Sequence, residues 1–170
     1  GIMKNDPGLT ILDAQDAVCS RLEKIFSGAT YNSAAGVRKP VSIYPQDLPV
    51  PNGNDDDVDS DPAVTEAPYI ITRLTEGKVK GDDNNILLIL IFGAYDQAND
   101  RSGYRDVVSM IQRVIASVKT KPYVGKNFEV HKDDIPWAIN QENTSPYNFG
   151  AMQLTLSVPS YNQEPDSALV

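Results

Sequence analysis

The sequence predicts an α+β domain in which two principal helices pack on one face of a mainly antiparallel or mixed sheet. Two stretches have the apolar spacing of amphipathic helices, and between them runs an unbroken apolar segment, 86–92, that is typical of a buried strand. Near the end of the chain, residues 152–158 alternate apolar and polar side chains, which predicts a half-buried strand. The order of helix, strand, hairpin, helix and two further strands favours this fold class.

The first helix is predicted over residues 9–26. Thr10 and Asp13 resemble a capping box, and the apolar residues that follow fall within an arc of about 80° when each residue turns by 100°. A stretch of small residues then leads to a short strand at 41–44, which Pro45 closes. Residues 46–68 contain several prolines, an Asn-Gly pair and many acids, so a flexible loop is expected there.

The second half of the chain begins with two strands, 69–74 and 86–92, which a polar turn joins into a hairpin whose second strand is central. A second helix follows Gly103, because the apolar residues from Val107 to Val118 occupy about 120° of one helical face. Further strands are predicted at 128–130, 137–139 and 152–158. The polar tail, 160–170, is expected to be frayed.

Length and composition indicate a single domain over residues 1–170, with a core at about 9–159. The chain is 41% hydrophobic and 22% charged, which is ordinary for a soluble globular protein. Its longest apolar run is far shorter than the roughly 20 residues of a bilayer-spanning helix, so no membrane contact is expected. Nothing at the start of the chain resembles a signal peptide. The only cysteine, Cys19, cannot form an internal disulfide.

The net charge of −8 is concentrated in one place. Six acids lie between Asp55 and Glu66, and no Lys or Arg occurs in 40–72. Elsewhere the basic residues are scattered, without the aromatic-interleaved basic stripe that proteins use to bind nucleic acid. Specific nucleic-acid binding is therefore disfavoured.

The acidic segment has the spacing of an EF-hand loop. Acids stand at its positions 1, 3, 5, 7 and 12, namely Asp55, Asp57, Asp59, Asp61 and Glu66. However, Ser60 replaces the glycine that makes the sharp turn, Pro62 follows, and the flanks are rich in proline where helices are required. A solvated acidic loop is favoured, calcium binding and a docking arm remain alternatives, and no metal site is predicted.

No residues form a recognisable catalytic centre. His131 is the only histidine, and Asp133 and Asp134 lie too close to it in an apparent strand to converge on one metal ion. A Ser-His-Asp triad would have to form without a Gly-x-Ser-x-Gly motif, and the Gly-Lys pairs lack the rest of a phosphate-binding loop. We therefore expect no enzymatic activity and no cofactor. A hydrolase is a third alternative, with His131 as its only plausible general base.

Aromatic residues gather before the last strand. Trp137, Tyr147 and Phe149 are compatible with a small core under a loop, and equally with an exposed aromatic patch of the kind that anchors subunit interfaces. The sequence leaves both interpretations open.

Taken together, five segments occur in an order and spacing that resemble the tail-terminator (tail-completion, minor tail) proteins of long-tailed bacteriophages and prophages. The segments are 68–71, 91–96, 103–106, 136–137 and 146–150. With the leading helix and the total length, the resemblance covers about 9–159. The acidic loop at 46–68 departs from the pattern of that family.

The resemblance implies a structural virion protein that closes into a ring of six on the tail tube, ends tube polymerisation and provides the head-tail joining surface. Its partners would be other copies of itself, the tail tube protein and the head-tail connector protein. It would be assembled in the host bacterial cytoplasm and located in the virion tail. The implied contact residues are Trp137, Tyr147 and Phe149, with Tyr95 and Asp96 as weaker candidates. Another phage neck or baseplate component and a small calcium-responsive binding module are the alternatives.

Overall fold

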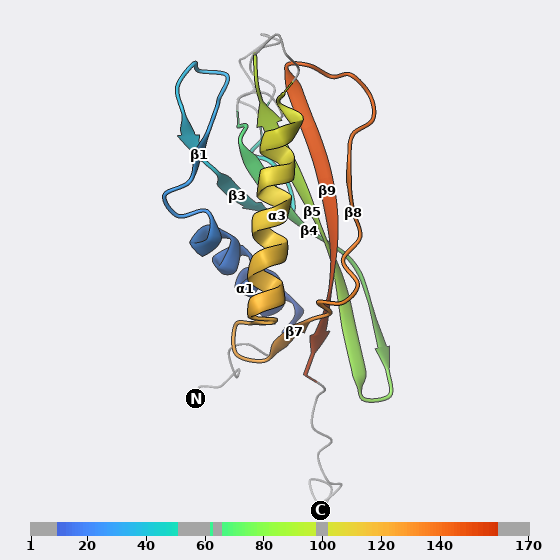
Figure 1. Ribbon diagram of the computed structural model, residues 1–170. Helices are drawn as coiled ribbons and strands as arrows, with labels where there is room; N and C mark the ends of the chain where they lie inside the picture. The colour runs from blue at the N-terminus through green and yellow to red at the C-terminus, as the bar shows by residue number, and fades with distance from the viewer. Residues whose placement is uncertain (1–9, 51–61, 63–65, 98–101, 160–170) are drawn as a thin grey trace, which may run out of the picture.

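The computed structural model describes residues 10–50, 62, 66–97 and 102–159. Two helices, α1 (Ile11–Ile25) and α3 (Tyr104–Thr120), lie on one side of a seven-stranded sheet (Figure 1). The strands of this sheet are β3 (Ser42–Pro45), β4 (Tyr69–Lys80), β5 (Asp83–Tyr95), β6 (Tyr123–Val124), β7 (Phe128–Val130), β8 (Trp137–Ile139) and β9 (Tyr147–Val158). A separate small hairpin consists of β1 (Thr30–Tyr31) and β2 (Lys39–Pro40). The predicted α+β class with two principal helices is confirmed.

The sheet is mixed, and its centre is formed by β5. The strand order is β3-β4-β5-β9-β7-β6, and β8 pairs with β9. Only β3 and β4 are parallel, whereas all other pairs are antiparallel. The pairing of β5 with β9 runs without interruption from Asn84 opposite Val158 to Tyr95 opposite Tyr147. The hairpin with a central second strand was predicted correctly.

The first helix begins at a capping box, as the sequence predicts. The backbone N–H of Asp13 donates to Thr10 Oγ1 at 3.0 Å, and the backbone N–H of Thr10 donates to Asp13 Oδ2 at 3.1 Å. Both bonds satisfy donors that a helix start otherwise leaves unpaired. Ala14, Val18 and Leu22 then form the buried face of α1.

The second helix packs closely on β5 and β9. Its buried face is formed by Val107, Met110, Ile111, Val114 and Val118. Close packing needs the glycine at position 150 of β9, because a Cβ there would lie 2.6 Å from Val107 Cγ1. Between the helices and the sheet lies a single core that contains side chains of both helices and of the helix-facing side of β5.

Arg21 of α1 holds the C-terminal end of α3. Its Nη1 donates to the carbonyl oxygen of Lys121 at 2.9 Å and its Nη2 to that of Tyr123 at 2.8 Å. The same Nη1 also lies 3.2 Å from Ser117 Oγ. The guanidinium therefore links the two helices and the start of β6 by charge-assisted hydrogen bonds.

Several strand boundaries differ from the prediction. The last strand begins at Tyr147, five residues earlier than 152. The aromatic residues Tyr147 and Phe149 continue the pairing of β9 with Gly93–Tyr95 of β5. The strands of the hairpin are also longer, and Gly81 and Asp82 alone form its turn. The strands β1, β2 and β6 were not predicted, since two residues are too few to carry a periodic pattern. Most of the predicted acidic loop and the whole tail lie outside the described residues.

Candidate interaction surface

The face of the sheet that α1 and α3 leave free is a candidate surface, and we call it the outer face. Alternate residues of β5 point to opposite faces of the sheet. Those that face the helices are fully buried, whereas Leu87, Ile89 and Ile91, which point to the outer face, are half-buried. No helix of the described chain covers this face (Figure 1).

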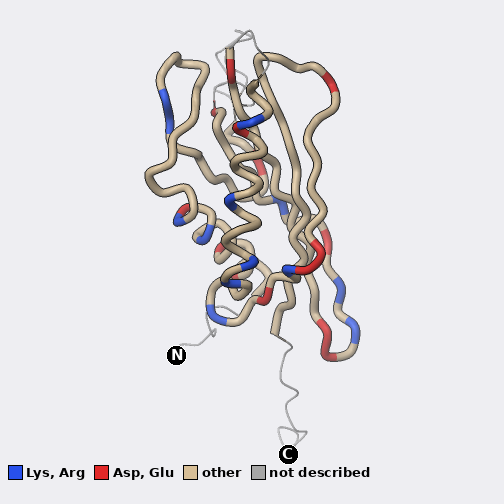
Figure 2. The backbone as a smooth tube through the Cα atoms, viewed as in Figure 1, with Lys and Arg blue, Asp and Glu red and all other residues tan. Residues whose placement is uncertain are grey.

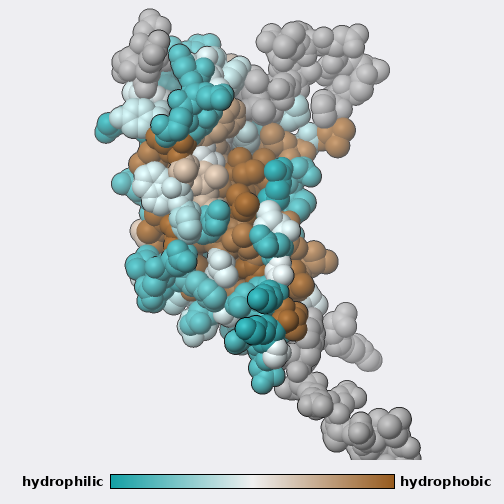
Figure 3. Space-filling model, turned by 90° about the vertical axis from the view of Figure 1, so that its right-hand side faces the viewer, coloured by the Kyte–Doolittle hydropathy of each residue, from teal (hydrophilic) through white to brown (hydrophobic). Residues whose placement is uncertain are grey.

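Neighbouring strands extend this apolar surface. Directly opposite residues of antiparallel strands share a face, so Ile71 of β4 and Ala151 of β9 flank Ile91. Phe149 lies two residues further along β9 on the same face. We call the set Ile71, Leu87, Ile89, Ile91, Phe149 and Ala151 the outer-face patch. Apolar side chains also gather across the side of the molecule where β8 and the β4–β5 hairpin lie (Figure 3).

Charged residues lie on the side of the patch that is nearer to the turn of the β4–β5 hairpin (Figure 2). Arg73 and Glu76 stand opposite Ile89 and Leu87 in the β4–β5 pairing. Arg73 is ion-paired with Asp47, with Nη2 and Oδ1 2.8 Å apart. An apolar centre with a charged rim is the usual composition of a protein interface.

Four of the five predicted contact residues meet at one end of β5 and β9. Tyr95 and Tyr147 stand opposite each other, and their ring centroids are 5.4 Å apart at an interplanar angle of 50°. The backbone N–H of Asp96 donates to the carbonyl oxygen of Pro146 at 2.9 Å, and Phe149 follows on the same face. Tyr95 is buried, so within this cluster Tyr147 and Phe149 are the more accessible rings.

Tyr69 completes this aromatic cluster, although the sequence analysis did not single it out as a contact residue. It stands opposite Gly93, and a Cβ on Gly93 would lie 2.0 Å from its ring. The Tyr69 ring therefore lies directly over the backbone of β5, where only glycine leaves room. A glycine inside an otherwise apolar strand is the signal that could have indicated such a close approach.

Trp137 is not part of the cluster. It stands opposite Met152, which is fully buried on the helix-covered side of β9, so the two side chains leave the sheet on that same side. Because β8 is an edge strand, the side chain of Trp137 remains 51% exposed. The predicted residues are thus divided: the rings of Tyr95, Tyr147 and Phe149 lie on the outer face, whereas Trp137 lies on the helix-covered side.

The loop after β5 brings two carboxylates near the start of α3. Burial raises the pKa of Asp106, and the neighbouring charge of Asp96 raises it further, whereas Arg38 lowers it. Ser102 Oγ lies 3.5 Å from Asp96 Oδ2. These groups fix the junction between β5 and α3.

The only histidine takes part in a polar chain across three strands. His131 Nε2 lies 2.7 Å from Ser157 Oγ, and Ser157 Oγ donates to Asn85 Oδ1 at 3.2 Å. A serine has a single hydroxyl proton, and since Asn85 Oδ1 accepts it, His131 Nε2 is the donor of the shorter bond. A histidine that activates a nucleophilic serine must instead accept that proton. The arrangement therefore ties β5, β9 and the end of β7 together.

Within the described ranges, no three His, Cys, Asp or Glu side chains lie close enough to hold a metal ion. The acids Asp55–Asp61 of the EF-hand-like segment lie outside those ranges. Its last acid, Glu66, accepts a hydrogen bond from the hydroxyl of Tyr44. Burial and this bond raise the pKa of Tyr44. Neither of the long helices of the described chain has the length and apolar content needed to cross a membrane.

Comparison of the chain with protein-family models and with curated protein sequences gave no match.

Proposed function

We propose that this chain is a tail-terminator subunit of a long-tailed bacteriophage or prophage, a structural protein of the virion. Copies of the chain would form a ring of about six on the finished tail tube, which blocks addition of the next tube subunit and offers a surface to the head-tail connector protein. The observation that carries the proposal is the outer-face patch, where Leu87, Ile89 and Ile91 remain partly exposed on a sheet face that no helix of the described chain covers.

The patch suits a protein that works by contact. Its central residues, Leu87, Ile89 and Ile91, are aliphatic and lie on a regular sheet, and part of their surface is still available for burial against a partner. Burial of apolar area is the main driving force of protein association. In this proposal, assembly into the virion covers the patch.

A closed ring also needs two unlike surfaces on each subunit, because its contacts are heterologous. The edge at Trp137 differs from the outer-face patch in chemistry and lies on the other side of the sheet. An exposed tryptophan is also the residue type that most often dominates the energy of an interface. In this proposal, the edge at Trp137 is the second surface for subunit contact.

The proposed role involves no reaction. The ring acts by occupying the end of the tube while DNA passes through its bore. The scattered basic residues suit this role, since a strongly basic lining would hold the phosphate backbone.

The test combines light scattering and negative-stain microscopy of the full chain with a tube-length assay. Purified tail tube protein is allowed to polymerise with and without the chain, and we expect closed rings and shorter, capped tubes. Ile89→Asp places a charge in the outer-face patch and should abolish capping. Leu12→Asp, at a 65% exposed position of α1, is the matched control and should leave capping intact.

Each other outcome has a defined meaning. If Ile89→Asp caps tubes as well as the wild-type chain while remaining folded, the patch is not the assembly surface. Rings that leave tube length unchanged would favour another neck or baseplate component. A chain that stays monomeric both alone and with tubes would contradict the proposal. Assembly only with calcium would favour the calcium-responsive alternative.

A further inference from the structure

The free edges of the main sheet differ in how well their backbone groups are protected. An edge strand points every second N–H and C=O away from its neighbour, and these groups can pair with a strand of another chain. In the main sheet the free edges are β3 together with the part of β4 that β3 does not reach on one side, and β6 and β8 on the other.

The edge formed by β3 and β4 is protected along its length. β3 ends at Pro45, which has no N–H. The side chain of Gln46 then takes the place of a further strand residue, because its Oε1 accepts from the backbone N–H of Leu74 and its Nε2 donates to the carbonyl oxygen of Leu74, both at 3.0 Å. A bulge follows Leu74, and Lys78 and Lys80 place charges on the rest of this edge.

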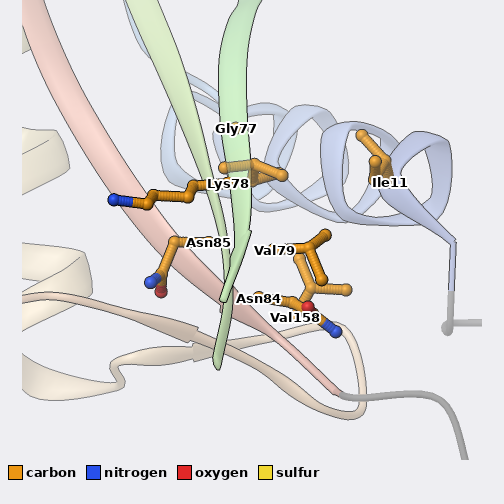
Figure 4. A pocket seen from close by; sticks show the side chains of 8 residues that line it. Ile11, Gly77, Lys78, Val79, Asn84, Asn85 and Val158 are labelled. Carbon is orange, nitrogen blue, oxygen red and sulfur yellow. The ribbon is translucent and has the colours of Figure 1, made fainter. Parts of the chain in front are cut away.

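A pocket also borders this edge on the helix-facing side of the β4–β5 hairpin (Figure 4). Its volume is about 280 Å³, and Ile11, Val79 and Val158 contribute apolar walls, whereas the side chain of Lys78 points away from the space. A strand added here would have a hollow beside one of its faces and lysine side chains beside the other. This edge is therefore poorly suited to strand addition.

The edge at β6 is short, and Arg21 protects it. The N–H of Val130 donates to the carbonyl oxygen of Pro122 at 2.7 Å, so the backbone groups of the next residue, Tyr123, point away from β7. Arg21 Nη2 donates to the carbonyl oxygen of Tyr123 at 2.8 Å. A partner strand would have to displace this charge-assisted hydrogen bond.

The edge at β8 points its backbone groups outward at two residues. The carbonyl oxygen of Pro136 and the N–H of Asn140 each bond to β9 at 2.9 Å. Because the bonding direction alternates along a strand, Ala138 also faces β9, whereas the N–H and C=O groups of Trp137 and Ile139 point away from it.

β8 lacks the protection of the other edges. It contains no charged residue, no proline and no bulge. Within the described chain, its outward groups make one hydrogen bond, from Gln141 Nε2 to the carbonyl oxygen of Ile139 at 3.2 Å, and this bond is exposed. Apolar side chains gather on this side of the molecule (Figure 3), and Trp137 is 51% exposed. An unprotected apolar edge of this kind is suited to pairing with another strand.

The side chains of β8 fit a second copy of the same strand. In an antiparallel pair centred on Ala138, this residue meets the partner's Ala138 at a non-hydrogen-bonded position, where the Cα atoms are only about 4.5 Å apart and small side chains fit best. Trp137 then stands opposite the partner's Ile139 at a hydrogen-bonded position, which is wider at about 5.5 Å. Aromatic and β-branched residues form favourable cross-strand pairs. The order large, small, large in β8 is thus complementary to itself.

We propose that β8 pairs with β8 of a second copy of this chain, antiparallel about a two-fold axis at Ala138, which joins the two main sheets into one. The side chain of Gln141 turns aside, and the carbonyl oxygen of Ile139 accepts from the N–H of the partner's Trp137. The contact is isologous and does not depend on the proposed ring. Since the ring would use the same edge, the dimer is the form of the chain before assembly, and it separates when the ring closes.

Sedimentation of the full chain over a concentration series tests the pairing, and we expect a dimer. Ile139→Pro removes an outward N–H but no bond to β9, so it should weaken dimerisation about tenfold or more while circular dichroism shows a folded chain. Val79→Pro is the matched control. In the β4–β5 hairpin the two-residue turn makes Lys80 and Asp83 a bonded pair, so the N–H of Val79 also points outward, but on the protected edge. Its dimer should be as stable as that of the wild-type chain.

Hydrogen exchange of the wild-type chain tests the pairing without any variant. Nuclear magnetic resonance should find that the N–H groups of Trp137 and Ile139 exchange about tenfold or more slowly at concentrations where the dimer predominates than in dilute solution. The N–H of Val79 should keep its rate. A dimer in which the N–H groups of Trp137 and Ile139 exchange as fast as in the monomer would overturn the proposal, and so would an equally stable dimer of folded Ile139→Pro.

The outcomes separate this pairing from the proposed function. A chain that is monomeric alone at every concentration but forms rings on tail tubes overturns the pairing and leaves the terminator proposal standing. Dimers with slowly exchanging N–H groups at Trp137 and Ile139 that never cap tubes support the pairing and contradict the terminator proposal.

Discussion

The two faces of the central strand β5 carry similar residues in very different surroundings. On the helix-covered face, Leu88 and Leu90 are completely buried beneath α1 and α3. On the outer face, Leu87 and Ile89 of the same strand are only half-buried. The residue types on the two faces of β5 therefore do not show which face belongs to the core.

This contrast shows where the molecule still has apolar surface that a partner could bury. Apolar area that is already buried contributes to folding, whereas the area that remains exposed on the outer face can contribute only when a partner covers it. A strand that is apolar on both faces in a sheet covered on one side is thus a sign of assembly. The following experiments test whether the two faces differ in this way.

The largest expected effect is the difference in unfolding free energy between alanine variants of two leucines that are adjacent in the sequence. Leu88→Ala creates a cavity in the core and should lower the free energy of unfolding by about 2–5 kcal/mol. Leu87→Ala removes the same atoms from the outer face and should cost less, about 1–2 kcal/mol, because part of that side chain is already in water. Urea unfolding of both variants measures the difference. Equal losses would show that the outer face is packed as tightly as the core.

The glycines of the two faces give the second comparison. Gly150→Ala forces a methyl group to within 2.6 Å of Val107 Cγ1 and should cost about 1–3 kcal/mol, because α3 must shift away from the sheet. Gly93→Ala puts a methyl group within 2.0 Å of the ring of Tyr69, which is only 2% exposed and has little room to move, so the loss should be at least as large. Thermal unfolding gives the stability change, and near-ultraviolet circular dichroism reports the displaced tyrosine. A clearly smaller loss for Gly93→Ala would contradict this account.

A substitution of Arg21 tests how much its hydrogen bonds between α1 and the end of α3 contribute to stability. Arg21→Ala removes the hydrogen bonds to the carbonyl oxygens of Lys121 and Tyr123 and should cost about 1–2 kcal/mol in urea unfolding. Arg113→Ala, at an exposed position of α3, is the control and should change stability by no more than about 0.5 kcal/mol. A similar small change for both would mean that the Arg21 bonds are replaced by water without loss.

The smallest effect concerns the pH dependence of stability at the start of α3. The pKa of Asp106 is raised in the folded chain by burial and by Asp96. The folded chain therefore binds the proton more readily than the unfolded chain does. The contribution of Asp106 to stability is fully present below its unfolded pKa and is lost as the pH rises through its raised folded pKa.

Asp106→Asn removes this group and should raise the melting temperature slightly at neutral pH. It should also reduce the relative gain in stability that the wild-type chain shows on mild acidification. Melting curves at several pH values measure both effects. An unchanged pH profile would show that the repulsion between Asp106 and Asp96 does not contribute to stability.

Many elements of the fold were predictable because their causes are local. The capping box at Thr10 and Asp13 marked the start of α1, and the one-sided apolar pattern from Val107 to Val118 marked α3. The unbroken apolar run at 86–92 indicated a central strand, and β5 is central. The early start of β9 was missed because Tyr147 and Phe149 are placed by pairing with β5, which is distant in the sequence.

The candidate surfaces were predictable only in part. The sequence indicated aromatic contact residues, and Tyr95, Tyr147 and Phe149 do meet. It could not show that Trp137 lies elsewhere, because the side of the sheet to which β8 directs that residue depends on its register with β9. It also could not show the pocket, since Ile11, Val79 and Val158 come together only when three distant segments meet.

The two helices and the central parts of the long strands follow from the sequence alone, since capping, periodicity and turn residues act over a few neighbours. Which face of β5 became the core depended on tertiary packing, because Leu87 and Leu88 are of the same residue type and differ only in whether a helix packs against them. Tertiary packing likewise left Asn84 Oδ1 buried without a donor, since that outcome depends on how strands distant in the sequence pair. Burial and hydrogen-bond satisfaction are properties of the packed chain, and they locate the surfaces proposed for its assembly.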